Sequence, residues 1–175
     1  LVEFLNRMYQ RFDEITNRTE MYKVEIIGDA YYCVSGVPME QADHAARAAY
    51  SALKMLEAIE EMKEEDSKLK SAKVRIRIGI HSDEVVAGIV GVKDPRYHLF
   101  GTTPQIANYM ESEGTPSRVH CSEATYNSLM DANNYTASDC QYNVSNFSCE
   151  KRTGPQIDLS KKGLGVFQTY YINDY

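Results

Sequence analysis

The stretch KVEIIGDAYYCVSG, residues 23–36, holds a carboxylate, Asp29, between two apolar runs. This pattern predicts a strand, a tight turn and a second strand, with Gly28 and Asp29 in the turn. An acidic side chain at such a turn raises the question of whether it holds a ligand. Taken alone, a Gly-Asp pair is better explained as an ordinary hairpin turn. The rest of the chain has to decide between these interpretations.

The first half of the chain predicts the elements that hold this hairpin in place. Apolar residues recur at helical spacing before the hairpin, and a long alanine-rich amphipathic pattern with an acidic end follows it. The predicted segments are a helix over 1–18, strands over 21–27 and 30–37, a helix over 40–66 and a polar link over 67–72.

The second half predicts further strands and short helices. In KVRIRIGIHS, residues 73–82, apolar and basic residues alternate, which is typical of a half-buried strand. The other predicted segments are a strand over 84–91, a short strand or loop over 96–101, a helix over 103–112, a strand over 118–122, a helix over 122–130 capped by Ser122, a loop or variable insertion over 131–156 and a last strand over 165–172. Because hairpins and helices do not strictly alternate, we expect one α+β domain over 1–175, with helices on a largely antiparallel sheet.

The composition is that of a soluble globular domain. The 175 residues are 43% hydrophobic and 25% charged, and this length allows a core without metal or disulfide support. The net charge of −6 argues against a general nucleic-acid binder, which should be basic. The apolar runs are too short to span a bilayer, and we expect no signal peptide at the start of the chain.

The cysteines and the Asn-X-Ser/Thr sequons bear on the compartment. No C-x-x-C pair is present, so a structural zinc site is not expected among Cys33, Cys121, Cys140 and Cys149. The sequons begin at Asn17, Asn134, Asn143 and Asn146. We expect reduced thiols and unused sequons in a cytosolic domain. The alternative is a secreted domain with a Cys140–Cys149 disulfide.

Three long motifs follow one another along the chain: YKVEIIGDAYYCVSGVP, RIRIGIHSDEVVAGIVG and PRYHLFGTTPQIANYMES. DHAARAAYSALKM and RVHCSEATYNSLM accompany them in order. Together they resemble the class III nucleotidyl cyclases, and the eukaryotic guanylyl cyclases in particular, over nearly all of the chain except 131–156. The resemblance implies a ferredoxin-like cyclase fold and the conversion of GTP to cGMP and pyrophosphate.

The resemblance also implies that Asp29 is a metal ligand. In this family two Mg²⁺ or Mn²⁺ ions activate the 3′-hydroxyl that attacks the α-phosphorus, and they neutralise the phosphates. A second metal aspartate comes from a strand ahead of the first helix, and this chain begins at that helix. Asp13, on the predicted helix, is better explained as a surface charge. We therefore expect the chain to be a piece of a longer polypeptide that lacks the first strand and half of the metal site.

Base recognition in this family comes from a second set of positions. The base-selecting position is Glu25, whose carboxylate can accept hydrogen bonds from N1–H and N2–H₂ of guanine, where adenylyl cyclases have a lysine. The alternative for Glu25 is a solvated charge on a strand. The second base position is His98, which could donate to guanine O6 or could be a packed histidine. The resemblance thus favours GTP over ATP as substrate.

The positions for ribose and phosphates depart from the family pattern. Gln105 replaces an asparagine and misplaces its amide by a methylene, which can cost on the order of a hundredfold in rate. Tyr109 replaces an arginine, and loss of such a cation can cost roughly 10³ to 10⁵ in rate, by analogy with arginine fingers. Leu164 stands where a second lysine is expected. Lys161 and Lys162 are candidates for phosphate contacts or are ordinary surface lysines.

Asp83 also replaces a glycine of the family, whereas Asp29 is intact. The resemblance implies that each active site forms between two domains, one giving the metal aspartates and the other the contacts to base, ribose and phosphates. Departures at the second set of positions, with the metal aspartate kept, resemble the alpha-like, metal-donating half of a heterodimeric guanylyl cyclase. We therefore expect a lyase domain that binds GTP and Mg²⁺ or Mn²⁺, binds no nucleic acid, and is active only with a second cyclase domain, with a heterodimer favoured over a homodimer. It would be cytoplasmic, with membrane contact only through other domains of the parent chain. The alternatives are a dimerising, regulatory pseudocyclase, an adenylate cyclase half and a plain ferredoxin-like interaction domain.

Overall fold

The computed structural model describes residues 2–136, 140–142 and 147–174. The first elements are α1 (Val2–Arg18), β1 (Tyr22–Ile27), β2 (Ala30–Val34), α2 (His44–Glu65), α3 (Ser67–Ser71), β3 (Ile78–Ile80), β4 (Val86–Val90) and β5 (Arg96–Phe100). They are followed by α4 (Thr103–Ser112), β6 (Val119–Ser122), α5 (Glu123–Met130), the 3₁₀ helix η1 (Ala132–Tyr135), β7 (Ser148–Lys151), β8 (Ile157–Asp158), the 3₁₀ helix η3 (Ser160–Lys162), β9 (Val166–Phe167) and β10 (Thr169–Asp174). The first helix, the hairpin at Asp29, the helix over 103–112 and the helix capped by Ser122 are confirmed.

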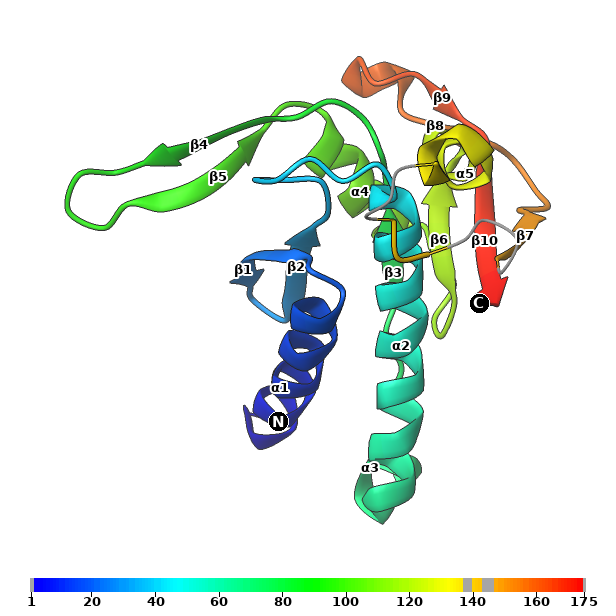
Figure 1. Ribbon diagram of the computed structural model, residues 1–175. Helices are drawn as coiled ribbons and strands as arrows, with labels where there is room; N and C mark the ends of the chain where they lie inside the picture. The colour runs from blue at the N-terminus through cyan, green and yellow to red at the C-terminus, as the bar shows by residue number, and fades with distance from the viewer. Residues whose placement is uncertain (1, 137–139, 143–146, 175) are drawn as a thin grey trace.

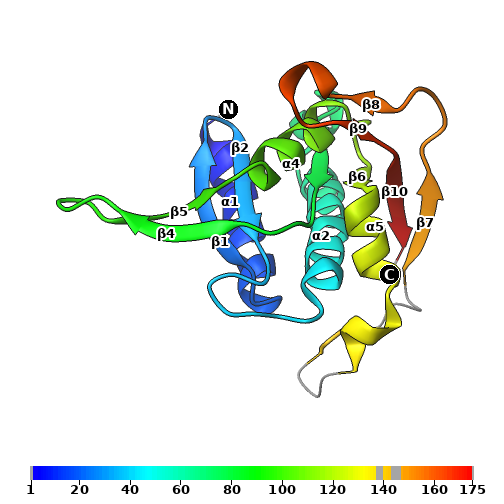
Figure 2. The same ribbon diagram turned by 90° about the horizontal axis from the view of Figure 1, so that it is seen from above.

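The described strands form one four-stranded sheet and three two-stranded hairpins. In the larger sheet, of order β3-β6-β10-β7, β3 runs parallel to β6, and β10 is antiparallel to both of its neighbours. Helix α2 runs beside this sheet, and the β4–β5 hairpin extends away from the body of the domain (Figures 1 and 2). The expected α+β class with a largely antiparallel sheet is confirmed.

Two boundary predictions around the long helix are wrong. Residues 67–72 are not a polar link, because the Asp66 side chain accepts a hydrogen bond from the Lys68 backbone N–H (2.9 Å) and starts α3. The long helix does not begin at residue 40. The side chain of Gln41 instead accepts hydrogen bonds from the Gly36 N–H (2.8 Å) and the Ser35 hydroxyl (3.0 Å), which holds residues 35–41 in a loop.

Three strand predictions also need correction. Residues 131–156 are not a loop throughout, because β7 completes the sheet by pairing with β10. Residues 137–139 and 143–146, with the sequons at Asn143 and Asn146, lie outside the described residues. The strand expected over 165–172 is divided into β9 and β10, with Gln168 between them accepting a hydrogen bond from the Glu123 N–H (3.0 Å). Only Ile78–Ile80 of the strand expected over 73–82 is paired.

Hydrogen bonds of a buried ion pair at the start of α2 tie it to the residues that follow α1. The Arg47 and Asp43 side chains are 3% and 2% exposed, and Arg47 Nε donates to Asp43 Oδ1 over 2.6 Å. Arg47 also donates to the Thr19 carbonyl (3.1 Å) and to the Glu20 carboxylate (2.7 Å). The second oxygen of Asp43 accepts from the Gln141 backbone N–H (2.8 Å). Because both charges are compensated, this network can stay buried.

Helix α4 is seated on β3 by a glycine. A Cβ atom at Gly79 would lie 2.0 Å from the Glu111 nitrogen and 2.6 Å from the Ala107 carbonyl oxygen, both backbone atoms of α4. The side chains of Ile106 and Met110 on this helix are buried. The position of α4, and of the residues on its outer face, therefore depends on the missing side chain at residue 79.

The described residues include all four cysteines and contain no disulfide, so the Cys140–Cys149 disulfide of the secreted alternative is not formed. Within the described residues, no helix combines the length and the apolar character that a membrane crossing requires.

Candidate active site

Asp29 occupies the turn between β1 and β2. Ile27 pairs with Ala30, and Gly28 has a φ of +64°, a left-handed conformation that glycine adopts at little cost. The Asp29 side chain is exposed and faces solvent at the end of a hairpin whose strands fix its position. Tyr9 of α1 lies close to this turn: burial raises the pKa of its hydroxyl, and the negative charge of Asp29 raises it further. The helical periodicity of residues 1–18 marks Tyr9 as a core residue and gave no sign of this proximity.

The fit of Asp29 to a metal ion is partial. Its carboxylate is accessible and chemically suited to Mg²⁺ or Mn²⁺. However, no group of three or more His, Cys, Asp or Glu side chains within the described residues could together hold an ion. These residues thus offer one candidate ligand and not a complete two-ion site, so further oxygen ligands would have to come from elsewhere.

Glu25 and His98 lie on neighbouring hairpins. Glu25 is half-buried on β1 opposite Tyr32, and His98 is half-buried on β5 opposite Gly88. The two hairpins meet where the rings of Tyr22 and Tyr97 pack edge to face, with centroids 5.2 Å apart. The structure therefore brings together the strands that carry the two predicted base positions.

Gln105 and Tyr109 are four residues apart on α4, which places them on one face of the helix. Gln105 is exposed and Tyr109 is half-buried. Lys162 donates a hydrogen bond from Nζ to the Tyr109 hydroxyl (2.5 Å) and lies 4.2 Å from the centroid of its ring. The structure thus joins two of the predicted positions, although they are 53 residues apart in sequence.

The two candidate lysines differ in their surroundings. Lys162 contacts α4 through Tyr109, whereas Lys161 is exposed, and no hydrogen bond of its side chain is found in the part of the chain that the structure describes. Leu164 is half-buried and packs with Tyr109 against a cluster that includes Ile106 and Met110 of α4. The residue in place of the expected lysine is therefore part of the apolar contact between this loop and the helix.

Asp83 lies close to the buried side chain of His81. Its carboxylate accepts from the Glu84 N–H (2.8 Å) and reaches within 4.0 Å of His81 Nε2. The His81 side chain is 2% exposed, its Nδ1 is 2.7 Å from the Ser122 hydroxyl, and burial lowers its pKa. Asp83 thus lies beside Nε2 of a buried imidazole, just beyond hydrogen-bond distance, and the described contacts of Asp83 do not include Asp29, Glu25 or His98.

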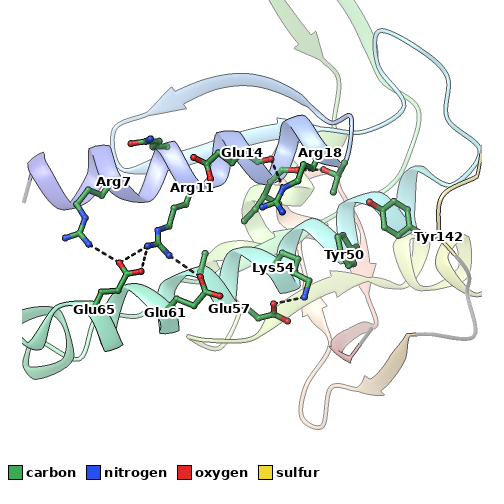
Figure 3. Close-up of a pocket in the computed structure, with 14 residues that line it drawn as sticks. Arg7, Arg11, Glu14, Arg18, Tyr50, Lys54, Glu57, Glu61, Glu65 and Tyr142 are labelled. Atoms are coloured by element: carbon green, nitrogen blue, oxygen red, sulfur yellow. Dashed lines mark hydrogen bonds and ion pairs between the residues drawn. The ribbon is translucent and has the colours of Figure 1, made fainter.

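A groove of about 870 Å³ between α1 and α2 lies apart from these residues (Figure 3). Its charges compensate one another: Arg11 binds both carboxylate oxygens of Glu65 (2.6 and 2.7 Å), and Lys54 binds Glu57 (2.6 Å). The groove contains none of the predicted site residues, and its ion pairs hold two helices together. We therefore place the candidate active site at the β1–β2 turn, β5 and α4.

The family model for the adenylate and guanylate cyclase catalytic domain matches residues 1–174. The chain is 45% identical over 172 residues to the guanylate cyclase soluble subunit beta-2 of Rattus norvegicus. The chain belongs to the adenylate and guanylate cyclase catalytic domain family. The match covers 98% of this chain and about a fifth, 22%, of that relative.

Solved structures give the same family. The guanylate cyclase domain of RhGC from Catenaria anguillulae, in complex with GTP, has a TM-score of 0.76 and 32% identity, over 97% of this chain and 81% of that chain. A dimeric guanylyl cyclase domain of the RhoGC fusion protein from Blastocladiella emersonii has a TM-score of 0.72 and 31% identity, over 97% and 81% of the two chains. The ferredoxin-like cyclase fold inferred from the motifs is therefore confirmed.

Proposed function

We propose that this chain is a guanylyl cyclase catalytic domain that converts GTP to cGMP and pyrophosphate. The observation that carries the proposal is the placement of Glu25 and Asp29 on one hairpin, with the strand of His98 packed against it at Tyr22 and Tyr97. A structural neighbour in complex with GTP and a relative named as a guanylate cyclase subunit support the choice of substrate.

In the proposed reaction, the 3′-hydroxyl oxygen of GTP forms a bond to the α-phosphorus while the bond from that phosphorus to the pyrophosphate leaving group breaks. These contributions belong to the two different pockets of a pair of domains: Asp29 contributes one oxygen ligand to divalent ions in one pocket, whereas in the other pocket the Glu25 carboxylate can accept from N1–H and N2–H₂ of guanine and the His98 imidazole can donate to O6. When bound, such ions neutralise charge on the phosphates.

The second half of the proposal is a partner cyclase domain. Gln105 and Tyr109 are poor replacements for an asparagine and an arginine, so we propose that a different subunit supplies these groups and that this chain supplies Asp29. The β4–β5 hairpin supports an assembly, because Val86, Ile89 and Val92 expose 71%, 73% and 103% of their surface on a projecting arm. A structural neighbour described as dimeric supports the same conclusion.

A pseudocyclase that dimerises and regulates is the second candidate function, and the residues at 105 and 109 favour it. An adenylate cyclase half is disfavoured by Glu25, which cannot donate to adenine N1. In either case we propose a single domain over 1–175 that acts in the cytoplasm, with any membrane contact made outside this domain.

The test is cGMP and cAMP formation with Mn²⁺ by the full parent chain, alone and mixed with an intact guanylyl cyclase domain that carries an Asp-to-Ala lesion in its own metal site. The proposal predicts cGMP only in the mixture, and its loss with Asp29→Asn in this chain. If the mixture formed no cyclic nucleotide although sedimentation showed that the two chains associate, the pseudocyclase would be favoured. Turnover by the chain alone that Tyr109→Ala abolishes would refute the assigned division of labour.

A further inference from the structure

The loop between β8 and β9 places a cation on the outer face of α4. Lys162 is exposed, yet its ammonium group has two contacts with one side chain: the hydrogen bond to the Tyr109 hydroxyl (2.5 Å) and the position 4.2 Å from the ring centroid. A lysine on a surface loop usually moves freely. Here the charge is held against Tyr109, and Gln105 lies one turn earlier than Tyr109 on the same helix face.

The backbone beneath Lys162 is also fixed. The N–H groups of Lys162 and Leu164 both donate to the Leu159 carbonyl (2.9 and 3.2 Å), and the Leu159 N–H donates to the Gly165 carbonyl (2.7 Å). Gly163 ends η3 with a φ of +74°, which favours glycine. Leu159 is 8% exposed and packs against α4. The backbone at Lys162 and the ammonium group of Lys162 are therefore both held against α4.

We propose that Tyr109 is a positioning residue that holds Lys162 as the cation of a phosphate-binding subsite on α4. This inference rests on the proposed function, because it takes the triphosphate chain of a nucleotide as the ligand. A lysine ammonium has three N–H donors, so two remain for phosphate oxygens when Tyr109 accepts one. Since Lys162 is already held in place, less side-chain freedom is lost when the anion binds.

The inference gives Tyr109 a role beyond the loss of an arginine. An arginine at this position would place a second cation against Lys162, whereas the tyrosine oxygen and ring attract the ammonium group. Leu164 packs in the same cluster as the Tyr109 ring, so the two departures from the family pattern are in one contact. Tyr109 and Leu164 together thus leave one positioned cation at this face, Lys162.

The test is a titration of the purified full chain with inorganic pyrophosphate in EDTA, so that divalent ions at Asp29 contribute nothing. Lys162→Gln should weaken binding about tenfold, the scale of a charge-assisted hydrogen bond. Tyr109→Leu should weaken it about threefold, because Lys162 must then be ordered on binding. Lys68→Gln, which removes an exposed lysine of α3 at the far end of α2, is the matched control and should leave the affinity unchanged (Figure 1).

The double variant Tyr109→Leu/Lys162→Gln decides whether Tyr109 acts through Lys162. The proposal predicts that it binds no more weakly than Lys162→Gln alone. Equal affinity of Lys162→Gln and wild type, or additive losses in the double variant, would overturn it. Tyr109→Phe keeps the ring and completes the cycle if the leucine variant does not fold. Pyrophosphate binding through this pair in a chain that forms no cGMP with any partner would refute the proposed function and leave this inference intact.

Discussion

Replacing Gly79 with alanine should displace the helix that carries Gln105 and Tyr109. The new Cβ atom would lie 2.0 Å from the Glu111 nitrogen and 2.5 Å from the Met110 carbonyl carbon, where an ordinary contact begins at 3.4 Å. The difference, 3.4 − 2.0, requires α4 and β3 to separate locally by about 1.4 Å. Overpacking of this kind costs about 1–3 kcal/mol of the free energy of unfolding, and backbone clashes place Gly79→Ala at the upper end of that range.

The assay is urea unfolding of Gly79→Ala beside Gly88→Ala. Gly88 is also a strand glycine without a positive φ, and a Cβ atom there meets nothing within 4 Å. The free energy of unfolding of Gly88→Ala should therefore lie within about 0.5 kcal/mol of the wild-type value. If both variants unfolded at the wild-type midpoint with unchanged m-values, the close packing of β3 on α4 would be refuted.

Three further changes test other parts of the structure. Asp43→Asn should lower the free energy of unfolding by about 3 kcal/mol, because it weakens the pairing of buried Arg47. A urea midpoint equal to that of wild type would contradict this. Burial lowers the pKa values of His81 and His120, so the unfolded chain binds more protons as the pH falls through about 6.5. Stability should therefore decrease on acidification from pH 7.5 to 5.5, and a flat profile of urea midpoints would be the opposing result. In the proposed pair, the pocket that contains Asp29 takes its base contacts from the partner, so Glu25→Lys should leave the ratio of cAMP to cGMP unchanged, whereas a shift toward cAMP would place Glu25 at the base of the productive pocket.

The elements around the candidate site could be predicted where a sequence period and a local signal agree. The β1–β2 hairpin combines two apolar runs with Gly28, whose positive φ the turn requires. Helix α4 combines helical spacing with Pro104 in its first turn, and α5 has its cap at Ser122. In each case the information lies within about ten residues, which is the range over which propensity and capping act.

The rest depends on contacts between distant residues. Strand β7 has no alternating pattern, and it is a strand because the edge of β10 is available to pair with it. Helix α3 depends on the Asp66 cap and on Leu69, which packs against the α1–α2 core. The contact of Lys162 with Tyr109 spans 53 positions and requires the β8–β9 loop to fold onto α4, so the motif identified the positions but not their pairing.

The two faces of helix α4 have different roles: one packs in the core and stabilises the fold, and the other carries residues of the proposed site. Met110 is fully buried and Ile106 is 5% exposed, whereas Gln105 faces solvent and Tyr109 is only partly covered. Substitutions on the outer face remove little buried area, so a fold intact at Gly79 and Met110 can accept a glutamine and a tyrosine at 105 and 109 without unfolding. This explains how the domain can keep the fold of its family with Gln105 and Tyr109 at the proposed ribose and phosphate positions. It also means that Gln105→Ala should change nucleotide affinity with a nearly unchanged free energy of unfolding, whereas Met110→Ala should lower the free energy of unfolding by about 2–5 kcal/mol.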